Sequence, residues 1–209
     1  MMYNVILPLL AYLLGGIPFG LIIGKLFFKI DIRNAGSKNI GATNVNRLCG
    51  KTAGIATFLL DALKGAIIII LARKFIGVTH LLEIIIAVSA ILGHAFSPYL
   101  KFKGGKAVAT SFACLLALAM PITVYVGIFW VMSMLAFATV GIASISSALL
   151  LILSGIMMNI TILSSEKSAI LYLYDTSFWI FVGILIIYKH IPNIKEIKSK
   201  LKGVVQPDS

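Results

Sequence analysis

Long apolar runs are the feature that most constrains how this chain can fold. Seven of them are separated by short polar segments, at roughly 3–28, 53–72, 81–98, 107–120, 122–140, 145–163 and 177–188. A helix needs roughly 20 mostly apolar residues to cross a bilayer. The pattern therefore predicts an all-α integral membrane protein with about seven transmembrane helices. Because the run at 107–120 is marginal and the last run is short, six spans plus a re-entrant segment are an open alternative.

The composition is typical of a membrane domain. Of the 209 residues, 60% are hydrophobic and 12% are charged, whereas a soluble domain is about half apolar and about a quarter charged. The net charge of +11 does not indicate a nucleic-acid partner, because the charges lie in short stretches between apolar runs. Cys49 and Cys114 make no metal-ligand pattern, so we expect no metal site. Residues 1–209 are expected to form a single polytopic domain.

The distribution of basic residues predicts the orientation. The first run continues from Val5 to Phe28 with no basic residue before it, so we expect an uncleaved span and not a signal peptide. Fourteen of the 18 Lys and Arg residues fall in segments that share one side if seven spans alternate: 25–51, 101–106 and the tail from 189. By the positive-inside rule this side is cytoplasmic, and the N-terminus lies outside. The loops expected at the cytoplasmic face are 29–52, 99–107, 141–147 and the tail 189–209.

The first polar segment, 35–47, has the composition of a phosphate-binding loop. Its glycines allow backbone N–H groups to turn inward, and Arg47 can bind two phosphate oxygens at once. The neutral hydrogen-bonding side chains are Ser37, Asn39, Thr43 and Asn44. An ordinary polar loop would be expected to mix Glu with Lys, whereas the only acid near this segment is Asp31. A binding loop is therefore favoured over a segment that only orients the spans.

Two ionisable residues, Asp61 and Lys64, lie inside the second apolar run. Burying either one alone in a span is costly. Their i, i+3 spacing places them on one helix face, where they can neutralise each other. The pair could line a polar cavity or could simply pack two helices together, and the sequence does not favour either interpretation.

A second anion site is predicted between 93 and 110, where a basic, glycine-containing loop runs into an apolar helix. Gly104 and Gly105 precede Lys106, and a lysine beside a helix N-terminus is a favourable place for an anion. The spacing is not that of a Walker P-loop. The alternative, a loop that only anchors the membrane orientation, would explain the lysines but not the paired glycines.

Two smaller features complete the set of candidates. Ser144 belongs to a run of small hydroxyl residues at 141–147, for which helix packing is the favoured interpretation when the run is taken alone. His190 and Asn193 follow the last apolar run.

Together these segments resemble the acyl-phosphate-dependent glycerol-3-phosphate acyltransferases of bacteria, the PlsY family. The resemblance rests on Gly-Ser-x-Asn-x-Gly-Ala-Thr-Asn-Val-x-Arg at 36–47 and Asp-x-x-Lys-Gly at 61–65. It continues with Gly-His-x-Phe-Ser-Pro…Phe-Lys-Gly-Gly-Lys at 93–106 and His-x-x-Asn-Ile-Lys at 190–195. Each motif is weak alone, but four in order across a multi-spanning chain are specific.

The resemblance implies a transferase of the bacterial plasma (inner) membrane that opens phospholipid synthesis. It would move a fatty acyl group from acyl-phosphate to the 1-hydroxyl of glycerol-3-phosphate, giving lysophosphatidic acid and phosphate. The family uses no metal or other cofactor, and no acyl-CoA or acyl carrier protein. In agreement, none of the three histidines begins the His-x-x-x-x-Asp motif of thioester-dependent acyltransferases, because Ile85, Tyr99 and Lys195 occupy the fifth positions.

The resemblance also implies roles for the candidate residues. Arg47 and Lys106 would bind the phosphates, with Ser37 and Ser144 adding hydrogen bonds. His190 and Asn193 would orient glycerol-3-phosphate, and either His190 or the substrate's own phosphate would accept the hydroxyl proton. The remaining candidates would shape or line the substrate site: Asn39, Thr43, Asn44, Gly104 and Gly105.

The chain departs from the family pattern at positions where glycine is usual. Lys38 and Ala107 stand there, and the tail ends without the usual Gly-Thr-Glu. A transporter for phosphorylated metabolites is the alternative function, since Asp61 and Lys64 would suit one. Against it, the polar motifs gather on one face and the two halves of the chain show no similarity. The acyl-chain preference and the oligomeric state cannot be predicted from the sequence.

Overall fold

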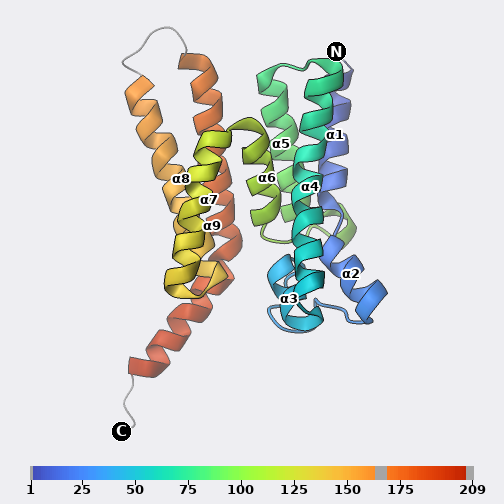
Figure 1. Ribbon diagram of the computed structural model, residues 1–209, viewed down its shortest axis with the longest axis vertical. Coiled ribbons are helices and arrows are strands. Elements are labelled where there is room, and N and C mark those ends of the chain that lie inside the picture. The colour runs from blue at the N-terminus through green and yellow to red at the C-terminus, as the bar shows by residue number, and fades with distance from the viewer. Residues whose placement is uncertain (1, 163–168, 206–209) are drawn as a thin grey trace.

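The computed structural model describes residues 2–162 and 169–205, with side chains described over 2–160 and 170–194. Lys167 and the side chains of the tail lysines from 195 onward lie outside these ranges. All regular structure within the described ranges is helical (Figure 1). The order is α1 (Tyr3–Gly16), α2 (Phe19–Phe28), α3 (Ala42–Cys49), α4 (Lys51–Ile76), α5 (His80–Ala95), the 3₁₀ turn η1 (Pro98–Leu100), α6 (Val108–Leu118), α7 (Met120–Phe137), α8 (Val140–Ile162) and α9 (Ala169–Val205).

Six stretches of the described residues are helical, long and apolar enough to cross a membrane. The α1–α2 pair, α4, α5 with η1, α7, α8 and α9 supply them. The fourth predicted span is represented by α6, whose 11 residues extend about 16 Å, well short of a hydrocarbon core of about 30 Å. Pro121 lies in the first turn of α7, a position that proline favours, and the chain reverses there (Figure 1).

The helices form two groups, one of α1, α4, α5 and α6 and one of α7, α8 and α9 (Figure 1). The first group packs closely because small residues lie at its contacts. A Cβ on Gly93 of α5 would overlap the backbone of Tyr12 in α1, so these two helices approach closely only because residue 93 is glycine. The groups meet where α9 contacts α5 and α6, and where α6 continues into α7.

The buried pair in α4 holds the first span in its broken shape. The first apolar run, predicted as one span over 3–28, is interrupted at Ile17 and Pro18. The ammonium of Lys64 lies 2.7 Å from Asp61 Oδ1, and it donates a hydrogen bond of 2.7 Å to the carbonyl oxygen of Ile17. An isolated charge at the middle of a span costs roughly 2.5–3.5 kcal/mol on insertion scales. The pairing and the exposed carbonyl at the break offset this cost.

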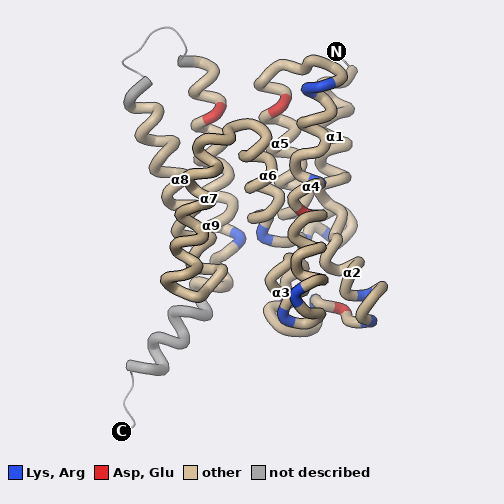
Figure 2. The backbone as a smooth tube through the Cα atoms, in the orientation of Figure 1, with Lys and Arg blue, Asp and Glu red and all other residues tan. Residues whose placement is uncertain are grey.

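The charged residues separate toward the two ends of the molecule. Figure 2 shows most Lys and Arg at the end that carries α2 and α3. At the opposite end, Arg73 of α4 bonds Glu83 of α5 at 2.6 and 2.9 Å. His80 of α5 lies 2.8 Å from Asp175 of α9 and 3.4 Å from Glu83. These contacts join α4, α5 and α9 at the end of the molecule opposite α2 and α3.

Several segments expected to be loops are helical. Residues 42–49 of the segment 29–52 form α3, the segment 141–147 lies in α8, and residues 189–205 of the tail continue α9. Arg73 and Lys74 lie in the last turn of α4, which extends past the predicted end of that span. The apolar pattern locates the membrane part of a helix, but it does not show where the helix ends once it leaves the lipid.

Candidate active site

A cavity of about 520 Å³ lies at the loop-bearing end of the molecule. All the predicted site residues line it except Gly104 and Gly105: Ser37, Asn39, Thr43, Asn44, Arg47, Lys106, Ser144, His190 and Asn193. The first residues of α3 and of α6 also line it. N–H groups at helix N-termini carry partial positive charge, and Arg47 and Lys106 add full charges. The cavity therefore favours anions.

Asn44 folds the first loop. It is 1% exposed, and its Nδ2 group lies within hydrogen-bond distance of the carbonyl oxygens of Ile32, Ala35 and Asn39, at 2.9, 3.2 and 3.0 Å. Its Oδ1 accepts a hydrogen bond of 2.9 Å from the backbone N–H of Ser37. Gly36 adopts a left-handed conformation, with φ of +58°, and a Cβ there would overlap Oδ1 of Asn44, so both the backbone and the contact favour glycine. Asn44 thus fixes the path of the loop and the place of Ser37.

An ion pair between Asp31 and Arg33 lies at the start of the same loop. Arg33 donates to both carboxylate oxygens of Asp31, at 2.9 and 2.6 Å. These hydrogen bonds hold the pKa of the Asp31 carboxyl well below its usual range. The loop's only acid is therefore ionised and paired with Arg33, away from the residues that line the cavity.

Lys106 and Asn193 meet across the cavity. Lys106 Nζ donates a hydrogen bond of 2.6 Å to Asn193 Oδ1, although the two residues come from the α6 loop and from α9. This contact joins the two helix groups at the site. It brings the predicted second anion site, at Lys106, next to His190 and Asn193, the residues predicted to orient the second substrate.

The hydrogen bond of His190 determines which tautomer its neutral ring adopts. The residue is 2% exposed, and its Nδ1 lies 2.8 Å from the carbonyl oxygen of Ile186 one turn earlier in α9. A carbonyl oxygen only accepts, so Nδ1 carries the proton in the neutral ring and Nε2 has the lone pair. The ring can thus accept a proton at Nε2 while the backbone holds its orientation.

Ser144 is held by a residue that sequence reasoning did not select. The serine is 2% exposed and its Oγ accepts a hydrogen bond of 3.2 Å from the indole N–H of Trp130. Both residues line the cavity. The hydrogen bond from Trp130 occupies one acceptor position of the Ser144 oxygen, and the hydroxyl can still donate its own proton to an anion.

Gly104 and Gly105 lie beneath the cavity lining, against the end of α5. The N–H of Gly105 donates a hydrogen bond of 3.0 Å to the carbonyl oxygen of His94. A Cβ on Gly105 would overlap the His94 imidazole, and one on Gly104 would overlap the His94 carbonyl oxygen. The paired glycines therefore allow a close approach that places Lys106 at the cavity.

His94 is the second cavity residue that the sequence did not single out as a site residue. It is 4% exposed, and its Nδ1 lies 3.1 Å from Thr110 Oγ1 and 3.7 Å from Asp61 Oδ1. Thr110 donates its own hydroxyl proton to the backbone oxygen of Asp61 at 2.9 Å. Asp61 lines the cavity as well as pairing with Lys64, whereas Lys64 is not among the lining residues and contacts the first span. The pair therefore joins two helices and contributes one side chain to the cavity. The one available signal was the position of His94 within the third motif.

Two of the three departures from the family pattern, Lys38 and Ala107, adopt left-handed backbone. Lys38 has a φ of +58° and Ala107 a φ of +60°. Glycine adopts this conformation freely, whereas other L-residues pay roughly 1–2 kcal/mol. The left-handed backbone at these two positions explains why glycine would be favoured there.

Replacing the exposed Lys38 by glycine is expected to stabilise the protein by about 0.5–1 kcal/mol, because relief of backbone strain exceeds the added freedom of the unfolded chain. Thermal unfolding in detergent should show a higher midpoint for Lys38→Gly. Lys103→Gly is the matched control, since Lys103 is exposed and is not among the residues with positive φ. A midpoint that falls equally in both variants would contradict the strain at Lys38.

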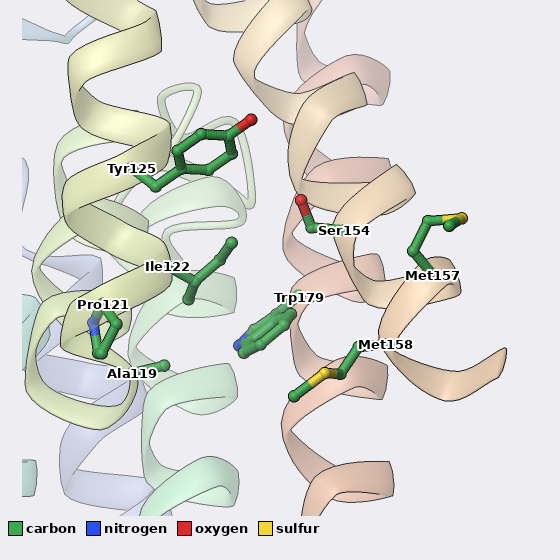
Figure 3. A pocket seen from close by; sticks show the side chains of 8 residues that line it. All are labelled: Ala119, Pro121, Ile122, Tyr125, Ser154, Met157, Met158 and Trp179. Carbon is green, nitrogen blue, oxygen red and sulfur yellow. The ribbon is translucent and has the colours of Figure 1, made fainter. Parts of the chain in front are cut away.

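A second cavity, of about 580 Å³, is apolar and lies further along the same helices (Figure 3). The ring of Trp179 in α9 faces Met158 of α8 and Ile122 of α7 across it. On α8, Ser154 of this cavity is ten residues from Ser144 of the first, a distance of about 15 Å along the helix.

The first cavity combines two cations, hydroxyl and amide groups, and a histidine with an available lone pair. Within the described part of the chain, no group of three or more His, Cys, Asp or Glu residues could hold a metal ion. The cations, hydroxyls, amides and histidine of the first cavity are suited to binding phosphate oxygens and to stabilising negative charge that develops during a reaction.

Known proteins are similar to this chain in sequence. The profile of the family described as "Glycerol-3-phosphate acyltransferase" matches residues 5–200. The glycerol-3-phosphate acyltransferase of Campylobacter lari is 40% identical over 207 residues, which cover 95% of this chain and 97% of that protein. The enzyme of the same name from Enterococcus faecalis is 42% identical over 198 residues, covering 93% and 88% respectively.

Solved structures share the fold. PlsY, an integral membrane glycerol 3-phosphate acyltransferase, is similar in its glycerol 3-phosphate form with a TM-score of 0.78 and 32% identity, covering 97% of this chain and 99% of the other. Its lysophosphatidic acid form aligns with a TM-score of 0.75 and 31% identity, covering 94% and 92%.

Proposed function

The chain belongs to the glycerol-3-phosphate acyltransferase family, and on that premise we propose that it takes its acyl group from an acyl-phosphate. It is a multi-pass membrane enzyme that acylates glycerol-3-phosphate to lysophosphatidic acid, as the substrate and product forms of PlsY support. The observation that carries the choice of donor is the single cavity lined by both Arg47 and Lys106. Two phosphates brought together repel each other, and two cations offset that repulsion.

The histidines support a donor that is already activated. A thioester-dependent enzyme uses a histidine oriented by a carboxylate. Here the nitrogen of His190 that could meet a carboxylate is bonded to a backbone carbonyl. His94 does lie 3.7 Å from Asp61, but Gly105 packs against its other nitrogen. An acyl-phosphate is a mixed anhydride whose phosphate leaves readily once its charge is stabilised, so positioning and cations suffice.

The catalytic and binding roles follow from this arrangement. Lys106 and Arg47 bind the two phosphates, and Ser37 and Ser144 donate further hydrogen bonds. His190 and Asn193 orient glycerol-3-phosphate with its 1-hydroxyl toward the acyl carbonyl. The hydroxyl oxygen bonds to that carbon, the bond to phosphate breaks, and the hydroxyl proton passes to Nε2 of His190 or to the departing phosphate.

The apolar cavity among α7, α8 and α9 suits the acyl chain. It begins about 15 Å from Ser144 along α8, a distance comparable to the length of a long fatty acyl chain. Its lining is exposed to lipid, because Met157 and Tyr125 are 62% and 56% exposed in the protein alone. The acyl chain would thus stay in an apolar environment while its phosphate reaches the basic cavity.

The site is proposed to face the cytoplasm of a bacterial cell, across its plasma (inner) membrane. Most Lys and Arg gather at the end that holds the cavity (Figure 2), and such residues are retained on the cytoplasmic side. Glycerol-3-phosphate is then available to the cavity from the cytoplasm.

A donor comparison tests the proposal. Purified protein in detergent, given glycerol-3-phosphate and palmitoyl-phosphate, should release one phosphate for each lysophosphatidic acid formed. Palmitoyl-CoA or palmitoyl-acyl carrier protein in place of palmitoyl-phosphate should give no product. Transfer from either thioester at a similar rate would overturn the donor assignment and leave the acyltransferase assignment intact. Flux of glycerol-3-phosphate into vesicles without product would instead indicate the transporter alternative.

A further inference from the structure

The carbonyl groups at the C-terminal end of α5 accept hydrogen bonds from three other parts of the protein. A helix ends with carbonyl oxygens that have no partner within it. Here the carbonyl of His94 accepts from the N–H of Gly105 at 3.0 Å, and that of Ala95 accepts from Lys189 Nζ at 2.7 Å. The carbonyl of Phe96, next in the chain, accepts from the Tyr12 hydroxyl at 2.9 Å.

Two of these contacts come from the immediate neighbours of proposed catalytic residues. Gly105 precedes Lys106, and Lys189 precedes His190. The ammonium of Lys189 also lies 4.8 Å from the centre of the Phe96 ring, a favourable cation–π distance. A cation is further favoured at a helix C-terminus by the partial negative charge of the carbonyls. The end of α5 is therefore a common support for both halves of the site.

A second contact fixes the same two helices at their other end. His80 of α5 lies 2.8 Å from Asp175 of α9. The two contacts are 15 residues apart on α5 and 14 apart on α9, or about 22 and 21 Å along the helices. Because these spacings match, α5 and α9 run side by side in one direction, and a slip of α9 by one residue would break both contacts.

We propose that Lys189 is a positioning residue for acyl transfer: its ammonium, bonded to the Ala95 carbonyl, sets the height of His190 and Asn193 relative to Lys106. Lys189 does not line the active-site cavity, so it acts through α9 and not on the substrate. One residue of slip along α9 moves His190 by about 1.5 Å, and a misplacement of about 1 Å in an active site can cost about 10²-fold in rate. This role rests on the acyltransferase function proposed above.

The test compares Lys189→Met with Lys189→Arg in the full-length protein. Methionine keeps the length and apolar contact of the side chain but cannot donate, and we expect its kcat to fall about 10- to 100-fold. The KM values for glycerol-3-phosphate and palmitoyl-phosphate should change by less than about threefold, because no substrate contact is lost. Arginine can still donate to Ala95 and contact Phe96, so Lys189→Arg should restore most of kcat.

Lys51→Met is the matched control, because it removes one positive charge from the same end of the protein at an exposed residue outside the cavity lining and outside the predicted anion-binding loops. Its kcat should equal that of wild type. An equal loss in Lys51→Met would show that net charge, and not positioning, matters. A wild-type kcat in Lys189→Met, or a raised KM with kcat unchanged, would likewise overturn the proposal.

Two other causes of a negative result, misfolding of the variant and a wrong acyl donor, can be distinguished from failure of the Lys189 proposal. If Lys189→Met does not give folded protein in detergent, Lys189→Gln replaces it. The glutamine amide is uncharged and one bond shorter than the lysine side chain, so it falls short of the Ala95 carbonyl, and the same loss of kcat and rescue by arginine are expected. If wild type transfers no acyl group from palmitoyl-phosphate, the donor assignment fails. The same variants then test Lys189 with whichever donor is active.

Discussion

Lys106→Met is expected to lower kcat/KM for acyl transfer by about 10³-fold, or about 4 kcal/mol of transition-state stabilisation. The side chain lies in the cavity with its Nζ bonded to Asn193 Oδ1 at 2.6 Å. Methionine keeps the apolar stem and removes the charge that would stabilise the phosphate during bond cleavage. Initial rates of phosphate release from palmitoyl-phosphate, measured with saturating glycerol-3-phosphate, give the comparison.

Two controls make the Lys106 result specific. Lys51→Met removes an exposed charge outside the cavity and the anion-binding loops, and it should keep wild-type activity. Lys106→Arg keeps the charge but changes its geometry, and it should recover part of the loss. Full activity in Lys106→Met would remove this residue from the phosphate site.

Gly104→Ala should lower activity by at least about 10²-fold, through the shape of the turn and without loss of a charge. Its Cβ would overlap the His94 carbonyl oxygen and lie 2.8 and 2.9 Å from the carbonyl carbon and oxygen of Ala95. These atoms belong to the last turn of α5 and cannot move aside as a side chain could. The turn must shift, and Lys106 shifts with it.

The control for Gly104→Ala is Gly127→Ala in α7. There a Cβ would lie 3.3 Å from the ring of Phe112, a side chain that can adjust. We expect Gly127→Ala to keep most of its activity and its detergent stability. Gly104→Ala with wild-type activity would contradict the fixed contact between the glycine turn and α5.

The order of the spans could be predicted from the sequence, because lipid selects long apolar runs whatever the tertiary contacts. The break at Ile17 was missed although Pro18 follows it, and a residue before proline disfavours the helical conformation. What the sequence could not show is the partner of the freed Ile17 carbonyl, because Lys64 is distant in sequence. Helix α3 was also missed. Its eight residues are too short to give a clear periodic pattern, and buried Asn44 is stabilised there by loop carbonyls and not by helix propensity.

The candidate site was predictable where polar residues cluster in loops, and less so where helices contribute single residues. Arg47 and Lys106 stand out because basic residues beside glycines are unusual in a chain that is 12% charged. Trp130 does not stand out, because a tryptophan in an apolar run is expected to face lipid. Its place at the cavity depends on how α7 packs against α8, which brings its N–H to Ser144.

The bond between Lys106 and Asn193 has a consequence for how the site exchanges its contents. The amide oxygen that accepts from the ammonium is neutral, so in the proposed mechanism an arriving phosphate would replace a weaker acceptor with a stronger one. A carboxylate at residue 193 would compete with the phosphate as an anion of its own. Asparagine would thus keep the lysine directed into the cavity between turnovers and release it to each incoming phosphate.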